Sequence, residues 1–233
     1  MERVLITGAT GLLGKNILSI IDKSKYEVLS PSSLQMNIKD IQSIKQYFNE
    51  RKINICIHSA ALTNVGDIEK DIKITQEAIY TNTVGTANIL MCCMESGTKM
   101  VYISTDHVFD GKKGNYTEKD KINPLSKYAK TKAAGELLVR TYHNSLVIRT
   151  SFFGEKFPYE KAFTDQWSSK DYIDVMAPKI LQTCLSTSVG IEHVYSKRRT
   201  LHEIATYRGD KVEKIKMADL GSAIPRPIDT SLN

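Results

Sequence analysis

The sequence lacks any apolar run close to the roughly 20 residues that a membrane-spanning helix needs. Its first residues carry charge at once, and no apolar core precedes a small-residue cleavage site, so we expect neither a signal peptide nor a membrane partner. Internal repeats and low-complexity segments are absent as well. Together these absences predict a globular protein of the cytoplasm.

Cysteine is scarce, and the four that occur (Cys56, Cys92, Cys93 and Cys184) form no Cys-x-x-Cys pair. No second pair stands at the spacing of a zinc site, so the sequence predicts no bound metal. Thiols in this arrangement are typical of free, buried side chains in a reducing compartment.

Strongly concentrated charge is also missing: the net charge of +6 has its densest part in the short run SKRR at residues 196–199. Aromatic residues do not interleave with this run, so we expect no nucleic acid partner. A mild positive excess suits a small anionic ligand instead. The sequence is compatible with a homodimer but does not establish the number of subunits.

Short β-branched runs alternate with longer amphipathic stretches over the first 150 residues, which predicts an α/β fold with a Rossmann-type doubly wound parallel sheet. The predicted strands are residues 3–7, 26–30, 53–60, 99–105 and 145–150, and the predicted helices are residues 12–22, 38–50, 75–96 and 124–142. After residue 150 the pattern loosens, with helices predicted at 173–185 and 200–209. We therefore expect a dinucleotide-binding domain over 1–150 and a smaller substrate-capping region over 151–233.

Three glycines, Gly8, Gly11 and Gly14, stand between the first predicted strand and the first predicted helix. Such glycines allow a tight turn, a close approach of the backbone to a pyrophosphate, and close packing of the helix on the strand. The pyrophosphate then faces the N–H groups at the start of the helix. The residues predicted to bind a dinucleotide here are Gly8, Thr10, Gly11, Leu12, Leu13 and Gly14.

The end of the second predicted strand indicates which dinucleotide is bound. An acidic residue about 20 positions after the glycine loop normally binds the ribose 2′-hydroxyl of NAD. This sequence has Ser30, Ser32 and Ser33 there and no Asp or Glu, and Lys15 adds a cation after the third glycine. Hydroxyl groups do not repel a 2′-phosphate, so we predict NADP as the cofactor, bound near Ser30, and leave NAD open.

The stretch PLSKYAKTKAAGE places Tyr128 four residues before Lys132, so both side chains lie on one face of a predicted helix. Reduction of a ketone needs a hydride, which NAD(P)H supplies, and a proton. A phenol has a pKa of about 10, and a neighbouring ammonium group lowers it. We therefore predict that Tyr128 donates the proton. The same helix is predicted to begin with Asn123 as its N-cap and Pro124 as its first residue.

A second pair, Tyr207 and Lys211, has the same spacing. Gly209 and Asp210 lie between the two residues and indicate a turn rather than a helix. We predict that this pair is structural or solvated.

Residues 101–136, VYISTDHVFDGKKGNYTEKDKINPLSKYAKTKAAGE, closely resemble the dTDP-4-dehydrorhamnose reductase family of extended short-chain dehydrogenases/reductases. Weaker likenesses lie at residues 57–65, 81–90, 163–181 and 224–233. The resemblance implies that Thr105 polarises the keto group and that Lys132 also binds the nicotinamide ribose. It further implies a cofactor site at Ala60, Ala61, Thr63, Asn82, Tyr128 and Lys132, and a substrate site at Thr105, Asp106, His107 and Arg226.

Two departures from the family pattern concern the substrate. His107 stands where the family has a tyrosine, and the stretch between residues 150 and 163 is shorter than in typical members. That stretch normally supplies a helix over the sugar nucleotide, so we expect the capping region to be shortened.

These observations lead to an NADP(H)-dependent reductase of a nucleotide-linked 4-keto-6-deoxy sugar, with dTDP or UDP as the nucleotide. Two alternatives remain open. One is a non-catalytic regulatory subunit, since the regulatory subunit of methionine adenosyltransferase resembles these reductases. The other is an epimerase or dehydratase of the same superfamily, for which Asp106 is the acidic residue that STDHV offers.

Overall fold

The structure is a computed structural model that describes residues 1–221 and 224–233. Its centre is a six-stranded sheet with the order β10-β5-β4-β3-β1-β2, in which every neighbouring pair is parallel. The strands are β1 (Glu2–Thr7), β2 (Tyr26–Leu29), β3 (Ile55–His58), β4 (Lys99–Thr105), β5 (Ser145–Thr150) and β10 (Gly190–His193). The predicted doubly wound parallel sheet is confirmed.

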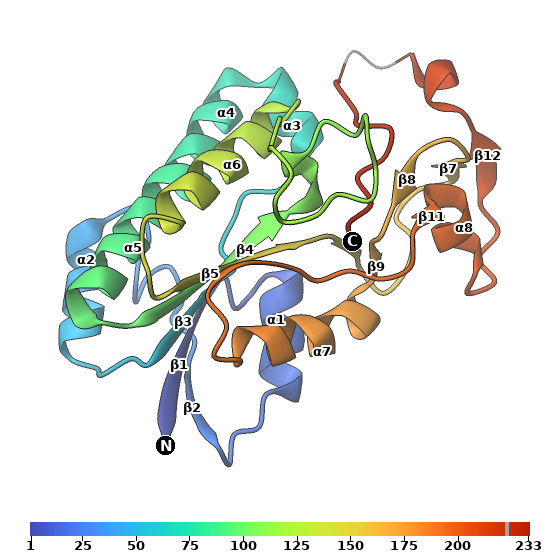
Figure 1. The fold of residues 1–233 in the computed structure, drawn as a ribbon. Coiled ribbons are helices and arrows are strands. Elements are labelled where there is room, and N and C mark those ends of the chain that lie inside the picture. Colours follow the sequence, from blue (N-terminus) through green and yellow to red (C-terminus); the bar gives the residue numbers. More distant parts are fainter. Residues whose placement is uncertain (222–223) are drawn as a thin grey trace.

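Helices cover both faces of the sheet, as Figure 1 shows. One face carries α1 (Leu12–Ile20) and α7 (Ile173–Cys184), and the other carries α2 (Ile41–Asn49), α5 (Gly85–Ser96) and α6 (Lys127–Val139). Successive side chains of a strand point to opposite faces. Val4 and Ile6 accordingly pack with α1 and α7, whereas Leu5 packs with α2 and α5.

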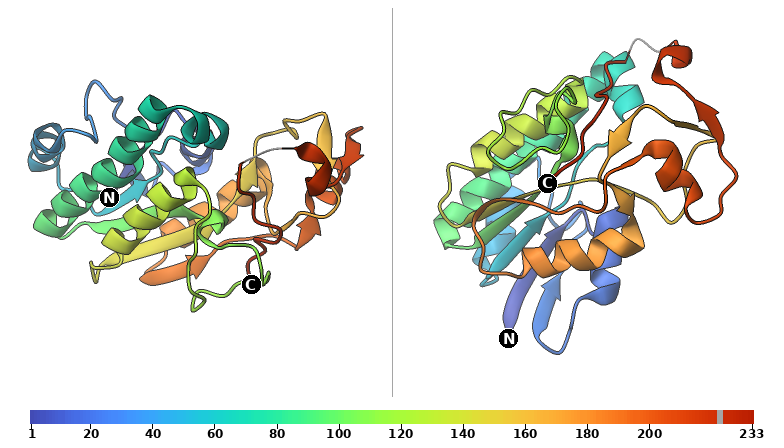
Figure 2. Two further views of the ribbon diagram at one scale, coloured as in Figure 1. Left: turned by 90° about the horizontal axis from the view of Figure 1, so that it is seen from above. Right: turned by 45° about the vertical axis from the view of Figure 1, so that its right-hand side comes forward.

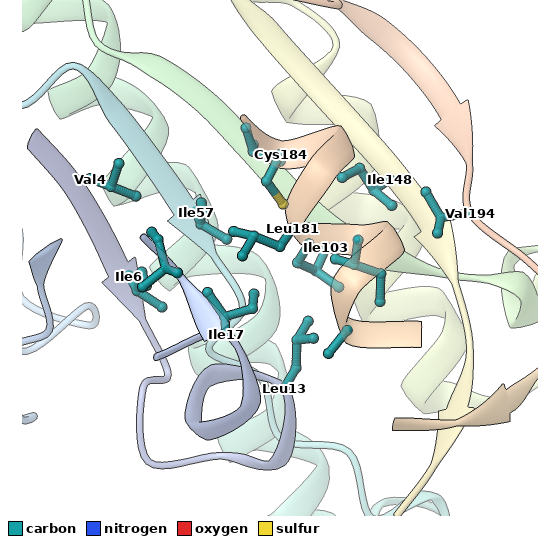
Figure 3. Close-up of a cluster of buried hydrophobic side chains, with 14 of the residues drawn as sticks. Val4, Ile6, Leu13, Ile17, Ile57, Ile103, Ile148, Leu181, Cys184 and Val194 are labelled. Carbon is teal, nitrogen blue, oxygen red and sulfur yellow. The ribbon is translucent and has the colours of Figure 1, made fainter. Parts of the chain in front are cut away.

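The core on the first face is continuous from helix to helix (Figure 3). Ile17 of α1 and Leu181 of α7 lie over Ile6, Ile103 and other apolar side chains of the strands. Because this packing fixes α1 on the sheet, it also fixes the glycine loop that leads into α1.

The long helix predicted over residues 75–96 is interrupted. The chain forms α3 (Val65–Lys70), α4 (Ile72–Ile79), a π-helical turn η1 (Tyr80–Val84) and then α5. Gly85 follows the π turn, and a Cβ atom there would lie 2.9 Å from the side chain of Ile38. Asn82, within the π turn, is fully buried and hydrogen-bonds to Leu62 in the loop that follows β3.

The predicted start of α6 was wrong by three residues. Ser126 is the N-cap, and its Oγ accepts a hydrogen bond of 3.1 Å from the backbone N–H of Ala129. Asn123 and Pro124 lie before the helix, and the Asn123 amide donates to Asp110 at 3.1 Å instead. Either side chain type can cap a helix, so the tertiary contact with Asp110 decided the outcome.

Most of the chain after β5 forms a cap beyond the carboxyl ends of the strands (Figures 1 and 2). It is built from small strand pairs and one short helix: β6 (Phe152–Phe153) with β9 (Asp171–Tyr172), β7 (Lys161–Phe163) with β12 (Glu213–Ile215), β8 (Trp167–Ser168) with β11 (Arg199–Thr200), and α8 (Leu201–Thr206). Two short 3-10 turns, η2 (Asp106–Val108) and η3 (Met217–Leu220), complete the elements.

Two elements from beyond residue 150 are part of the central α/β unit rather than the cap. Helix α7 packs in the same core as α1, and β10 pairs with β5 at the edge of the sheet. The predicted regions 1–150 and 151–233 therefore share one sheet and one core. Within residues 1–221 and 224–233, none of the helices has the length and apolar character needed to cross a lipid bilayer.

Candidate active site

A cavity of about 740 Å³ is lined both by residues at the carboxyl ends of the strands and by residues of the cap. Ligands of doubly wound proteins bind at this edge of the sheet. The cavity wall includes most of the residues predicted for the site: Gly8, Gly11, Leu12, Leu13, Gly14, Ala61, Thr63, Thr105, His107, Tyr128, Lys132 and Arg226. The structure thus brings the glycine loop and the Tyr–Lys pair to one space.

The glycine loop has the geometry of a phosphate site. Gly8 adopts a φ of +70°, and a Cβ atom there would lie 2.6 Å from the backbone nitrogen of Ala60. Gly11 is the N-cap of α1 and, within the described part of the chain, no side chain caps that end. The first N–H groups of a helix have no partner inside it and carry partial positive charge, so this end fits a pyrophosphate.

A second cavity of about 330 Å³ lies beside the glycine loop, and Gly8 lines both cavities. Thr10 and Ala60 line the second cavity, as do Ser32 and Ser33 after β2. Among its described lining residues there is no Asp or Glu. This wall fits an adenosine ribose that carries a 2′-phosphate, because nothing in it repels the additional charge.

The cation of the second cavity differs from the one expected from the sequence. Lys15 is exposed on α1 and lines neither cavity, whereas Lys39 lines the second one and forms an ion pair of 2.7 Å with Glu77. Lys39 follows β2 by ten residues in an irregular segment. No periodic pattern in the sequence indicates where such a residue folds back, so sequence reasoning missed it.

Three predicted residues do not line either cavity: Ser30, Asn82 and Asp106. Ser30 is exposed after β2. The Asn82 side chain accepts from the backbone N–H of Leu62 at 2.7 Å and donates to the Leu62 carbonyl and to Thr131, both at 2.9 Å. Asn82 therefore holds the loop after β3 in place from behind, rather than reaching into the cavity.

Lys132 is buried on α6, with 2% of its surface exposed, and its Nζ lies 4.0 Å from the centre of the Tyr102 ring. Burial lowers the pKa of Lys132 to about 7, and the negative charge of Glu136, one turn further along α6, opposes this shift. The Lys132 amine therefore loses its proton more readily than a solvated lysine does, and a nearby phenolate or phosphate would favour its charged form.

The expected lowering of the Tyr128 pKa is not found, and that expectation was wrong for the protein alone. Burial raises the pKa of the Tyr128 phenol well above its usual value, the charge of Asp106 raises it further, and a hydrogen bond with Thr105 opposes both effects. The sequence could not reveal this, because the burial comes from segments far apart in the chain. Tyr128 is therefore protonated at neutral pH, but the raised pKa also makes it a weaker acid, so proton donation requires a nearby positive charge that stabilises the phenolate.

Asp106 lies behind the cavity wall, with 1% of its surface exposed. Its carboxylate accepts hydrogen bonds from Thr105 at 3.2 Å, Ser168 at 3.3 Å and Thr230 at 2.8 Å. Burial alone would raise the pKa of Asp106, but the neighbouring charges of His107 and Lys170 and the hydrogen bond from Thr230 hold it below its usual value. Asp106 is therefore an ionised, internally bonded group and not a free acid facing substrate.

The cap supplies the far wall of the cavity. Arg226 lines the cavity, with its guanidinium carbon 5.8 Å from the centre of the Phe163 ring, and His107 lines it from η2, directly after β4. Lys170 and Trp167 also line it, although sequence reasoning gave them no role. Their segment, residues 163–181, was recognised by resemblance, but nothing in the sequence indicated which of its side chains face the cavity.

The alternative pair, Tyr207 and Lys211, is not a catalytic arrangement. Helix α8 ends at Thr206, and Gly209 then turns the chain with a φ of +90°. The Tyr207 hydroxyl donates to Asp171 at 2.6 Å, and neither Tyr207 nor Lys211 lines the large cavity. The predicted structural role of Tyr207 is confirmed.

Comparison with known proteins gives the family. The family described as RmlD substrate binding domain matches residues 1–181. The chain belongs to this family. A relative in Aggregatibacter actinomycetemcomitans, named dTDP-4-dehydrorhamnose reductase, is 34% identical over 185 residues, which are 77% of this chain and 62% of the relative. The subunit beta of methionine adenosyltransferase 2 from Rattus norvegicus is 32% identical over 145 residues, which are 59% of this chain and 42% of that protein.

The fold has a close counterpart among solved structures. The crystal structure of dTDP-4-dehydrorhamnose reductase from Bacillus anthracis in complex with NADP superimposes with a TM-score of 0.88 at 27% identity, covering 100% of this chain and 90% of that one. The alignments with the two curated relatives, in contrast, span less than two thirds of each relative's length.

Proposed function

We propose that the protein is an NADPH-dependent reductase of a nucleotide-linked 4-keto-6-deoxy sugar. The observation that carries this proposal is one cavity whose wall contains both a phosphate-binding glycine loop and the side chains of Thr105, Tyr128 and Lys132. The family and the NADP-bound neighbour support the same chemistry. NADP is favoured over NAD by the second cavity, which combines hydroxyl groups with Lys39.

The three catalytic side chains have different roles in this reaction. Bound NADPH supplies the hydride to the keto carbon. Tyr128, protonated at neutral pH, gives its proton to the keto oxygen. Thr105 can donate a hydrogen bond to that oxygen once its single O–H turns from Asp106, to which it donates at 3.2 Å in the ligand-free protein. Lys132 then stabilises the phenolate that Tyr128 has become, and it binds the nicotinamide ribose. Since the phenolate favours the charged form of Lys132, the two pKa values move toward each other during the reaction.

The proposal is tested by measuring NADPH oxidation with a panel of dTDP- and UDP-linked 4-keto-6-deoxy sugars. We expect turnover with one nucleotide series and none with the corresponding sugars that already carry a 4-hydroxyl group. Cofactor binding without turnover of any substrate would contradict the proposal. The oligomeric state is a separate question: a homodimer remains a prediction, and the number of subunits can be measured on the same samples.

A regulatory role is the second candidate, because the subunit beta of methionine adenosyltransferase 2 is among the relatives. The presence of Thr105, Tyr128 and Lys132 on one cavity wall favours catalysis over this role. A dehydratase or epimerase is disfavoured by Asp106, because hydrogen bonds from three hydroxyl groups occupy its carboxylate and it does not line the cavity.

Lys39→Ala is expected to weaken binding of NADPH by about fivefold, as for loss of a partly exposed charge pair, and to leave NADH unchanged. Trp167 is the single tryptophan and lines the large cavity, so its fluorescence reports binding directly. Lys15→Ala serves as the control, since Lys15 lines neither cavity. An equal loss for both cofactors would show that Lys39 does not contact a 2′-phosphate.

Arg226→Ala is expected to raise the KM of the sugar nucleotide by about tenfold or more, because a guanidinium can grip a diphosphate with charge-assisted hydrogen bonds. The affinity for NADPH should not change, since Arg226 comes from the cap side of the cavity. Arg140→Ala, an exposed residue at the end of α6, is the matched control. An unchanged KM would exclude Arg226 from the substrate site.

A further inference from the structure

Three segments that are distant in the sequence meet at the carboxylate of Asp106. Thr105 donates to Oδ1 at 3.2 Å, while Ser168 and Thr230 donate to Oδ2 at 3.3 and 2.8 Å. These donors come from the end of β4, from β8 in the cap and from the last residues of the chain. A single buried carboxylate therefore joins the end of β4, the cap and the C-terminal segment.

The C-terminal segment, residues 224–233, runs back from the cap to lie beside the loop after β4 (Figures 1 and 2). Its backbone bonds to Trp167 on the cap side, with Trp167 N–H donating to Ile228 and Thr230 N–H donating to Trp167. On the other side, Asp229 N–H donates to the carbonyl of Gly111 at 3.0 Å. The segment thus bridges the cap and the loop that follows β4.

The C-terminal segment packs closely against the loop that follows β4. A Cβ atom at Gly111 would lie 2.7 Å from the backbone nitrogen of Ile228, so only glycine allows the approach. The Asp229 carboxylate accepts from Arg198 at 2.6 Å, which anchors the same segment to the cap. Displacement of residues 224–233 would therefore move both Arg226 and Thr230 together.

Burial makes the Asp106 carboxylate sensitive to its partners. A buried charge is stable only when hydrogen bonds replace the water it has lost, and removal of one partner costs more than an exposed bond of the same length. Thr105 also accepts a hydrogen bond of 3.2 Å from the backbone N–H of His107, so its hydroxyl is held from two sides. Because the single O–H of Thr105 donates to Asp106, a change at this carboxylate must alter both the position of the Thr105 hydroxyl and how readily its proton turns toward the cavity.

We propose that Asp106 is a positioning residue, whose carboxylate orients the Thr105 hydroxyl and fastens the C-terminal segment that carries Arg226. The role of Thr105 and Arg226 toward a sugar nucleotide rests on the proposed function. The hydrogen-bonded junction itself does not. One carboxylate then couples the group that holds the keto oxygen to the group that holds the nucleotide, so damage to it lowers kcat and raises KM together.

The test is Thr230→Val, which keeps the shape of the side chain and removes the 2.8 Å hydrogen bond to Asp106. We expect kcat to fall and KM to rise, with kcat/KM lower by about tenfold or more. Thr230→Ser retains the hydroxyl and should restore both constants. Thr141→Val removes a hydroxyl whose bond, to the carbonyl of Leu138, is exposed, and it is the matched control.

Hydrogen exchange of the ligand-free protein gives a readout that needs no substrate. Thr230→Val should speed exchange of the amides at residues 105–108, which lie far away in the sequence, as well as at residues 224–232. Direct contact of Thr230 with substrate would not produce this effect. If Thr230→Val is poorly folded, Ser168→Ala removes the other donor to Oδ2 and should act in the same direction.

The outcomes separate this proposal from the proposed function. Unchanged exchange at residues 105–108 in both variants would overturn the positioning role, whether or not the protein turns over sugar nucleotides. A fall in kcat with unchanged KM would overturn the coupling to Arg226. Faster exchange in a protein that reduces none of the tested sugars would support the junction and contradict the reductase.

Discussion

Tyr128→Phe is expected to lower kcat by roughly 100- to 10,000-fold, the range that general acid catalysis contributes. The change removes one hydroxyl from the cavity wall and leaves the helix, whose N-cap is Ser126, intact. Binding of NADPH should therefore persist, and Trp167 fluorescence can verify it on the same sample. The kinetic measurement is NADPH oxidation with the substrate found in the panel.

Tyr207→Phe is the internal control, because Tyr207 has the same spacing to a lysine and a hydroxyl bonded to Asp171 at 2.6 Å. It should cost some stability and leave kcat nearly unchanged. A variant pair in which Tyr207→Phe abolishes turnover and Tyr128→Phe does not would show that α6 is not the catalytic helix.

Arg149→Met is expected to reduce the free energy of unfolding by about 3–5 kcal/mol, since it leaves a buried carboxylate without its partner. Arg149 and Glu136 are 1% and 0% exposed, and their closest N–O distance is 2.6 Å. Ser104, on the cavity wall, donates to the same carboxylate at 2.7 Å, so the ion pair supports the floor of the active site. Urea denaturation measures the loss.

Two further variants show whether burial is the cause. Arg208→Met breaks a pair with Asp174 at 2.9 Å whose side chains are 30% and 60% exposed, and it should cost less than about 1 kcal/mol. The double variant Glu136→Leu, Arg149→Met should recover most of the lost stability, because apolar side chains often replace a buried ion pair without penalty. Equal losses for Arg149→Met and Arg208→Met would contradict this account.

Local pattern was sufficient to predict most of the sheet and many of the residues that line the large cavity. The apolar runs of β1, β3, β4 and β5 were predicted because buried parallel strands need continuous β-branched and apolar residues. Gly8, Gly11 and Gly14 lie within seven residues of one another, so their spacing alone predicted a dinucleotide-binding loop without knowledge of distant contacts. The choice of Tyr128 over Tyr207 followed from Gly209, which breaks the second pair locally.

Contacts between distant segments decided the rest. The sequence did not show that β10 joins the sheet, because a four-residue edge strand with mostly half-buried side chains has no distinct pattern. It also could not show that Lys39 rather than Lys15 faces the second cavity, since that depends on how the segment after β2 folds back.

The electrostatics of the site belong to tertiary structure as well. The sequence predicted Thr105, Tyr128 and Lys132 as the catalytic set and Asp106 as a substrate-binding residue. The pKa of Tyr128 shifts in the direction opposite to the expected one, and Asp106 lies behind the cavity wall rather than on it. Desolvation depends on which segments cover a group, and Asp106 is covered by residues from β8 and from the C-terminal segment. Sequence alone determined which functional groups are present; the packing of the cap on the sheet decided which of them are ionised and which face the cavity.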